Sequence, residues 1–112
     1  MSIIQITVQE LAERLAGEHQ DLQLIDVRER HEVEIAAIAD FTILPLSEYE
    51  EWAADFKEKF DPHAETLVLC HHGMRSAQMC QWLIERGFTN VKNIDGGIDA
   101  YAYIVDPTMA KY

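Results

Sequence analysis

The sequence predicts an α/β protein in which helices cover both faces of a parallel β-sheet. Short apolar runs, too brief to be helices, alternate along the chain with longer segments of helical periodicity. Strands that are separated by helices in this way pair in parallel through right-handed crossovers. The 112 residues suffice for one hydrophobic core, so we expect a single domain.

Individual elements follow from caps and apolar spacing. Thr7 and Glu10 form a capping box that starts the first helix, and Ser47 and Glu50 form a second one that opens an aromatic helical face. The predicted helices are 8–16, 28–37, 47–60, 75–86 and 98–105, and the predicted strands are 22–27, 41–44, 65–69 and 90–94. Candidate core contacts of the second helical segment are Val33, Ile35 and Ile38.

Charge and cysteine content limit the classes of function. Nine basic and 20 acidic residues give a formal net charge of −11, which repels nucleic acids and anionic membrane surfaces. No apolar run reaches the roughly 20 residues of a membrane span. The two cysteines are too far apart to form a disulfide, and the first residues lack the pattern of a secretory leader, so we expect a cytoplasmic protein. A monomer is the expected oligomeric state.

Three predicted strands are followed by residues with functional chemistry. These segments are 26–28 (Asp-Val-Arg), 70–75 (Cys-His-His-Gly-Met-Arg) and 95–97 (Asp-Gly-Gly). In open parallel sheets, ligands bind beyond the carboxyl ends of the strands. We therefore expect the three segments to meet at one edge of the sheet.

Cys70 ends the third predicted strand and precedes a helix, where backbone N–H groups of the loop and of the first helical turn converge. Such donors favour a thiolate and can lower a cysteine pKa from about 8.5 into the range of roughly 3.5 to 7.5. Arg75 adds positive charge, Gly73 lets the backbone turn inward, and Ser76 can cap the helix or donate to the sulfur. We predict that Cys70 is a nucleophile in a nest of donors.

Other interpretations of this loop compete with a nucleophile. A free cysteine at the end of a buried strand is often only a core residue, although that role requires no neighbouring glycine and arginine. Zinc bound by Cys70, His71 and His72 is disfavoured, because adjacent residues at a strand end point apart and structural zinc takes four ligands. We expect no metal and place the histidines at the rim of the pocket. Cys80 has the spacing of a buried helical stripe, which favours core packing.

Several segments together resemble the rhodanese-like sulfurtransferases. The loop CHHGMRS, preceded by TLVL and followed by AQMCQWLIERGF, is similar to the active-site loop and helix of that family. Upstream, LQLIDVRERHEVEIAAI resembles its Asp-Val-Arg-Glu segment, and downstream VKNIDGGIDAY resembles its Gly-Gly turn and final helix. The resemblance implies a rhodanese domain over 1–112, with a core of about 4–104. It also implies five parallel strands, the fifth at 3–6. We expect the tail, 105–112, to be loosely held.

The resemblance further implies a ping-pong sulfur transfer that uses no cofactor. The thiolate of Cys70 takes the outer sulfur of a small anionic donor such as thiosulfate and becomes a persulfide. An acceptor then removes that sulfur: cyanide in vitro, a thiol or a small redox protein in the cell. By resemblance Asp26 and Arg28 support the loop, although the residues alone also permit a surface ion pair. The substrate-binding residues would be His71, His72, Gly73, Met74, Arg75 and Ser76.

The chain departs from the family pattern in two places. Residues 36–41 read Ala-Ala-Ile-Ala-Asp-Phe where Gly-His-Ile-Pro-Gly-Ala is common, and Tyr101 replaces a tryptophan. Asp40 is expected to adopt the turn conformation that a glycine would hold there. These departures bear on the choice of acceptor more than on the sulfur chemistry.

Three rival functions use the same cysteine. One is a module that carries a persulfide for a partner protein, and the others are a cysteine-based phosphatase and an arsenate reductase. Tyrosine phosphatases have five residues between cysteine and arginine, whereas four separate Cys70 from Arg75. Within the rhodanese superfamily the shorter loop goes with sulfur donors, which favours sulfur transfer.

Overall fold

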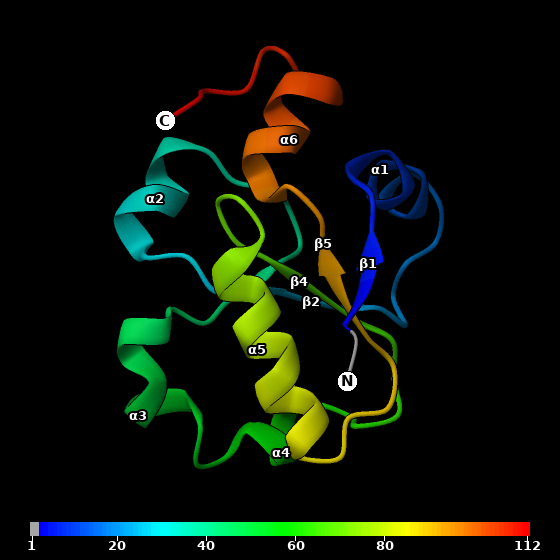
Figure 1. Ribbon diagram of the computed structural model, residues 1–112, viewed down its shortest axis with the longest axis vertical. Coiled ribbons are helices and arrows are strands. Elements are labelled where there is room, and N and C mark those ends of the chain that lie inside the picture. Colours follow the sequence, from blue (N-terminus) through cyan, green and yellow to red (C-terminus); the bar gives the residue numbers. More distant parts are fainter. Residues whose placement is uncertain (1–2) are drawn as a thin grey trace.

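The computed structural model describes residues 3–112 and contains a five-stranded parallel sheet (Figure 1). The strand order is β1-β5-β4-β2-β3. The strands are β1 (Ile4–Ile6), β2 (Gln23–Asp26), β3 (Thr42–Ile43), β4 (Thr66–Leu69) and β5 (Val91–Ile94). The predicted α/β class is confirmed, as is the fifth strand expected at 3–6. That strand pairs with β5 over three residues at the edge of the sheet, which is too short for a periodicity to be recognised.

Helices cover both faces of the sheet. They are α1 (Val8–Ala16), α2 (Arg30–Ile35), the 3-10 helix η1 (Leu46–Glu48), α3 (Tyr49–Trp52), α4 (Phe56–Lys59), α5 (Met74–Glu85) and α6 (Gly97–Ile104). One face packs against α3, α4 and α5, and the other packs against α1 and α6. None of the helices in residues 3–112 has the length and apolar character required to cross a membrane.

Alternating residues of the central strand β4 enter the two cores. Leu67 and Leu69 belong to the cluster with α1 and α6, whereas Val68 belongs to the cluster with α5. Because successive side chains of a strand point to opposite faces, Cys70 also joins the α5 side. The strand therefore directs the thiol toward the beginning of α5.

The expected core contacts of the second helix are partly wrong. Ile35 is 45% exposed, while Ile38 packs against the core as predicted. The buried residue of α2 is instead Glu32. A charged side chain occupies the inner face because its partner, Arg75, comes from another element.

The helix expected over 47–60 is divided into η1, α3 and α4. Its aromatic face is nevertheless in the core, since Trp52 and Phe56 are buried. The predicted capping box is wrong, because the hydroxyl of Ser47 donates to the carboxylate of Glu29. The capping box at Thr7 is confirmed: each residue of the pair bonds the backbone N–H of the other.

The three segments expected to meet do lie together at the carboxyl ends of β2, β4 and β5. Asp40 has φ +74°, the left-handed turn conformation that was predicted for it from the sequence. Two backbone hydrogen bonds continue the strand pairing at this end of the sheet. The Val27 N–H donates to the Leu69 carbonyl (3.0 Å), and the Asp95 N–H donates to the Ile6 carbonyl (2.9 Å).

The amino end of α6 binds the loop that follows Cys70. The N–H of Ile98 donates to the Cys70 carbonyl (2.9 Å), and the N–H of Asp99 donates to the His71 carbonyl (3.0 Å). Gly97 permits this approach: it has φ +61°, and a Cβ there would lie 2.5 Å from the Cys70 oxygen and 2.4 Å from the His71 oxygen. A side chain at this position would push the loop away from the helix.

We expect Gly97→Ala to lower the free energy of unfolding by roughly 2–4 kcal/mol, because it adds a clash to the cost of a left-handed conformation. Gly87→Ala is the matched control: Gly87 has φ +92°, but nothing lies within 4 Å of the point that a Cβ would occupy there. That variant should lose only about 1–2 kcal/mol. Urea unfolding of both variants measures the difference, and equal losses would contradict a steric role for Gly97.

Candidate active site

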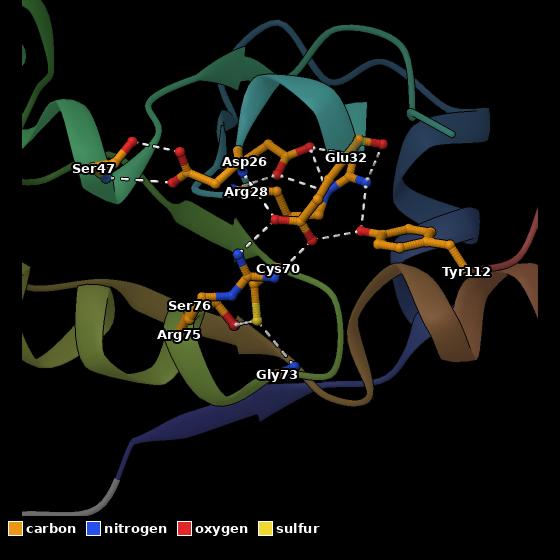
Figure 2. Close-up of polar contacts among 10 residues, drawn as sticks. Asp26, Arg28, Glu32, Ser47, Cys70, Gly73, Arg75, Ser76 and Tyr112 are labelled. Atoms are coloured by element: carbon orange, nitrogen blue, oxygen red, sulfur yellow. Dashed lines mark hydrogen bonds and ion pairs between the residues drawn. The ribbon is translucent and has the colours of Figure 1, made fainter. Parts of the chain in front are cut away.

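Cys70 lies at the centre of a small set of hydrogen-bond donors (Figure 2). It is 1% exposed, and its Sγ accepts the N–H of Gly73 (3.0 Å) and the hydroxyl of Ser76 (3.2 Å). Gly73 has φ +103°, which turns its N–H toward the sulfur. Both donors come from the loop and the first turn of α5, and both suit a sulfur that carries negative charge.

Three carbonyls of this loop accept hydrogen bonds from other elements. Those of Cys70 and His71 accept the N–H groups of α6 described above, and that of Gly73 accepts the side-chain amide of Asn93 (2.9 Å). Asn93 also contacts Ser76, with 2.5 Å between Oδ1 and Oγ. Sequence reasoning missed Asn93, which looked like an ordinary member of the fourth predicted strand.

Arg75 is fixed by a bidentate ion pair with Glu32. Its Nη1 and Nη2 donate to the two carboxylate oxygens at 2.7 and 2.8 Å. Hydrogen bonding to the guanidinium lowers the pKa of Glu32 to about 2, and the pair raises the pKa of Arg75. Both groups are therefore charged at neutral pH. Apolar periodicity could not indicate this role of Glu32, which is a charged residue. The only sequence signal was the position of Glu32 within the segment that resembles the family.

Asp26 and Arg28 are buried, at 1% and 0% exposure, so the alternative of a surface ion pair is wrong. Arg28 donates to Asp26 through Nη2 (2.8 Å) and Nε (3.0 Å). Its Nη1 donates to the hydroxyl of Tyr112 (3.0 Å), which in turn donates to Glu32 (2.9 Å). The pair thus contacts Arg75 indirectly, through Tyr112 and Glu32.

The expectation of a loosely held tail is wrong for its last residue. The ring of Tyr112 stacks on that of His71, with centroids 3.8 Å apart and planes within 9°. Burial raises the pKa of Tyr112 to about 12, so its hydroxyl keeps its proton and can donate to Glu32. The composition of the tail carried no signal for this anchor.

His71 and His72 lie at the pocket, with ring centroids 3.9 Å apart. Burial, followed by the nearby charge of His72, lowers the pKa of His71. Together with Asp99 the two histidines offer ligand atoms within 4.8 Å of one another. The planes of the two histidine rings are tilted by 32°. The absence of a resident metal stays a prediction.

A cavity of about 220 Å³ opens beside the sulfur. It is lined by Cys70, His71, His72, Met74 and Arg75. A larger hollow, of about 760 Å³, borders Leu22 and Asp40, at the opposite end of β2 and β3. No nucleophilic thiol lines that hollow, so the chemistry belongs to the smaller cavity.

Cys80 is a core residue, as predicted. It is fully buried in α5, and burial raises its pKa to about 12. Both cysteines are free thiols. Of the two, Cys70 has polar donors directed at its sulfur.

This fold and site define an α/β domain with a cysteine-centred pocket on a strand-to-helix loop. A family model described as a rhodanese-like domain matches residues 7–103. The Rhodanese-like/PpiC domain-containing protein 12, chloroplastic, of Arabidopsis thaliana is 47% identical over 92 residues, which are 82% of this chain and 31% of that protein. Thiosulfate sulfurtransferase GlpE of Coxiella burnetii is 32% identical over 82 residues, 73% of each chain.

A crystal structure of a rhodanese-like domain protein from Staphylococcus aureus has a TM-score of 0.77. It is 24% identical and covers 98% of this chain and 99% of that one, a likeness that concerns the fold. The chain belongs to the rhodanese-like domain family, whose members include sulfurtransferases by name. It spans less than a third of the length of the Arabidopsis relative.

Glu32→Gln should reduce stability in a pH-dependent way. The folded-state pKa of Glu32 is about 2 against 4.5 for the free group, so its stabilisation is complete above about pH 5 and is lost as the pH falls toward 2. Because Arg75 is 35% exposed, we discount for solvent screening and expect about 1–2 kcal/mol at neutral pH.

Urea unfolding at pH 7 and pH 3 measures this effect, and the difference between wild type and Glu32→Gln should shrink by more than half at pH 3. Glu48→Gln is the control, because it removes a bidentate pair with Arg30 that lies on the surface. We expect that variant to lose less. If Glu32→Gln loses the same free energy of unfolding at both pH values, the lowered pKa of Glu32 in the folded state is refuted.

Proposed function

We propose that this domain moves sulfane sulfur from a small anionic donor, such as thiosulfate, to a thiophilic acceptor through a persulfide on Cys70. The observation that carries the proposal is the sulfur of Cys70 at the cavity, held by a backbone N–H and a hydroxyl. Membership of the rhodanese-like family and the name of the GlpE relative support it.

In the first half-reaction the Cys70 thiolate attacks the outer sulfur of thiosulfate. A new S–S bond forms as the bond between the two thiosulfate sulfurs breaks, and sulfite leaves with the electron pair. The negative charge then resides on the outer sulfur of the persulfide. In the second half-reaction an acceptor thiolate attacks that outer sulfur, and the electron pair of the broken S–S bond returns to Cys70 as its thiolate.

Fixed donors make both half-reactions easier. The N–H of Gly73 already faces the position of the sulfur, so it stabilises a developing thiolate with little reorganisation. The hydroxyl of Ser76 lies within hydrogen-bond distance of the same sulfur. Arg75 uses two of its five N–H groups for Glu32, which leaves three to bind a donor anion. His71, His72 and Met74 complete the wall of the cavity.

Phosphatase and arsenate reductase activities are weaker candidates. The loop has four residues between Cys70 and Arg75, one fewer than in tyrosine phosphatases, and the cavity is small. Arsenate reduction calls for further thiols, and the second one, Cys80, is buried with a raised pKa. A persulfide carrier for a partner protein uses the same Cys70 chemistry and differs only in the acceptor.

The proposed setting follows from the same residues. The donor is a small anion, the acceptor is a thiol or a small redox protein, and the covalent persulfide replaces a cofactor. Two free thiols suit a reducing compartment, of which the cytoplasm is the simplest. We propose that the domain acts as a monomer and that neither nucleic acid nor a membrane takes part.

Incubation with thiosulfate should add the mass of one sulfur atom to the peptide that contains Cys70, and cyanide should then remove it as thiocyanate. Cys70→Ser should show neither change, because it lacks the attacking thiolate. Cys80→Ala is the matched control and should keep both, since Cys80 is a buried core thiol. Mass spectrometry of the intact protein and of the peptide that contains Cys70, together with a thiocyanate assay, measures the outcome. An unmodified wild type that hydrolyses an aryl phosphate would refute the proposal.

A further inference from the structure

The hydroxyl of Ser76 faces two acceptors at once. It lies 3.2 Å from Cys70 Sγ and 2.5 Å from Asn93 Oδ1. Ser76 is fully buried and Asn93 is 3% exposed, so bulk water does not compete at this point. A serine hydroxyl has one proton. Ser76 can therefore donate to the sulfur or to the amide oxygen, but not to both.

Asn93 cannot turn its oxygen away. Its Nδ2 donates to the Gly73 carbonyl (2.9 Å) and to Gln5 Oε1 (3.1 Å). A backbone carbonyl only accepts hydrogen bonds, so the amide nitrogen must face Gly73 and the oxygen must face Ser76. The competing acceptor is thus held in place by the same loop that holds the sulfur.

The state of the sulfur decides where the Ser76 proton goes. In the thiol, the S–H of Cys70 can donate to Ser76, and Ser76 donates to Asn93, so each group has a partner. The thiolate instead needs the Ser76 proton, which leaves the Asn93 oxygen buried without a donor. In the persulfide the charge has moved to the outer sulfur, and the Ser76 proton can return to Asn93.

We propose that Asn93 is a positioning residue that competes for the Ser76 proton and so disfavours the free Cys70 thiolate relative to the sulfur-loaded form. The statement about the persulfide rests on the proposed function, whereas the effect on the thiolate rests on the contacts alone. Loss of one buried hydrogen bond corresponds to roughly a threefold to tenfold change in an equilibrium.

The test is the rate at which iodoacetamide alkylates Cys70 at pH 7. Asn93→Leu removes the amide oxygen at similar size and should raise the rate about threefold to tenfold. Asn93→Asp keeps an acceptor opposite Ser76 and should react at or below the wild-type rate. Both variants lose the amide bond to Gly73, so general loosening of the loop would accelerate both.

Combining Asn93→Leu with Ser76→Ala tests whether Asn93 acts through Ser76 or through the general structure of the loop. Ser76→Ala should be alkylated more slowly than wild type, and Asn93→Leu should add nothing to it. The proposal is overturned if Asn93→Leu is no faster than wild type, if Asn93→Asp is accelerated as well, or if the acceleration persists without Ser76.

A second measurement uses the unmodified protein. The ¹³Cγ resonance of Asn93 should shift as Cys70 ionises, and an unchanged resonance would also overturn the proposal. Neither measurement needs a sulfur donor. If thiosulfate does not add sulfur to Cys70, the proposed function is refuted. The alkylation and resonance measurements still test the role of Asn93 in that case.

Discussion

The hydrogen bonds between the amino end of α6 and the carbonyls of Cys70 and His71 determine the shape of the site. They require a residue without a side chain at Gly97. While α6 binds these carbonyls, the N–H of Gly73 donates to the sulfur. The strand that leads into α6 also carries Asn93 to the same place. The loop around the sulfur is therefore held in place by a neighbouring strand of the sheet and the helix that follows it.

The charged groups near the sulfur occur as matched pairs within a strongly acidic chain. Arg28 is paired with Asp26, Arg75 is paired with Glu32, and the hydroxyl of Tyr112 connects the pairs. Each arginine is thereby held in one orientation, but most of its charge is offset. Fixed N–H and hydroxyl dipoles, rather than excess positive charge, distinguish this pocket from the acidic surface around it.

What could be predicted from the sequence depended on local patterns. Apolar periodicity gave the α/β class and the burial of Cys80, and the position of Cys70 at a strand end gave the pocket. The sequence did not indicate three site residues, because their partners lie far away along the chain. Glu32 contacts Arg75, Asn93 contacts Ser76 and Tyr112 contacts Glu32, over separations of 43, 17 and 80 positions. The same cause explains two of the wrong predictions: long-range polar partners turned Glu32 inward in place of Ile35 and drew Ser47 away from its cap.

The near-complete burial of Cys70 has a consequence for a persulfide formed there. Its outer sulfur would lie about 2 Å farther along the side chain, toward the cavity, while Sγ would stay shielded by the loop. A thiol that attacked the inner atom would form a mixed disulfide and release hydrosulfide, which wastes the sulfur. Since the course of such exchanges depends on which sulfur is accessible, shielding of Sγ would make an attack on this persulfide regioselective for the outer atom.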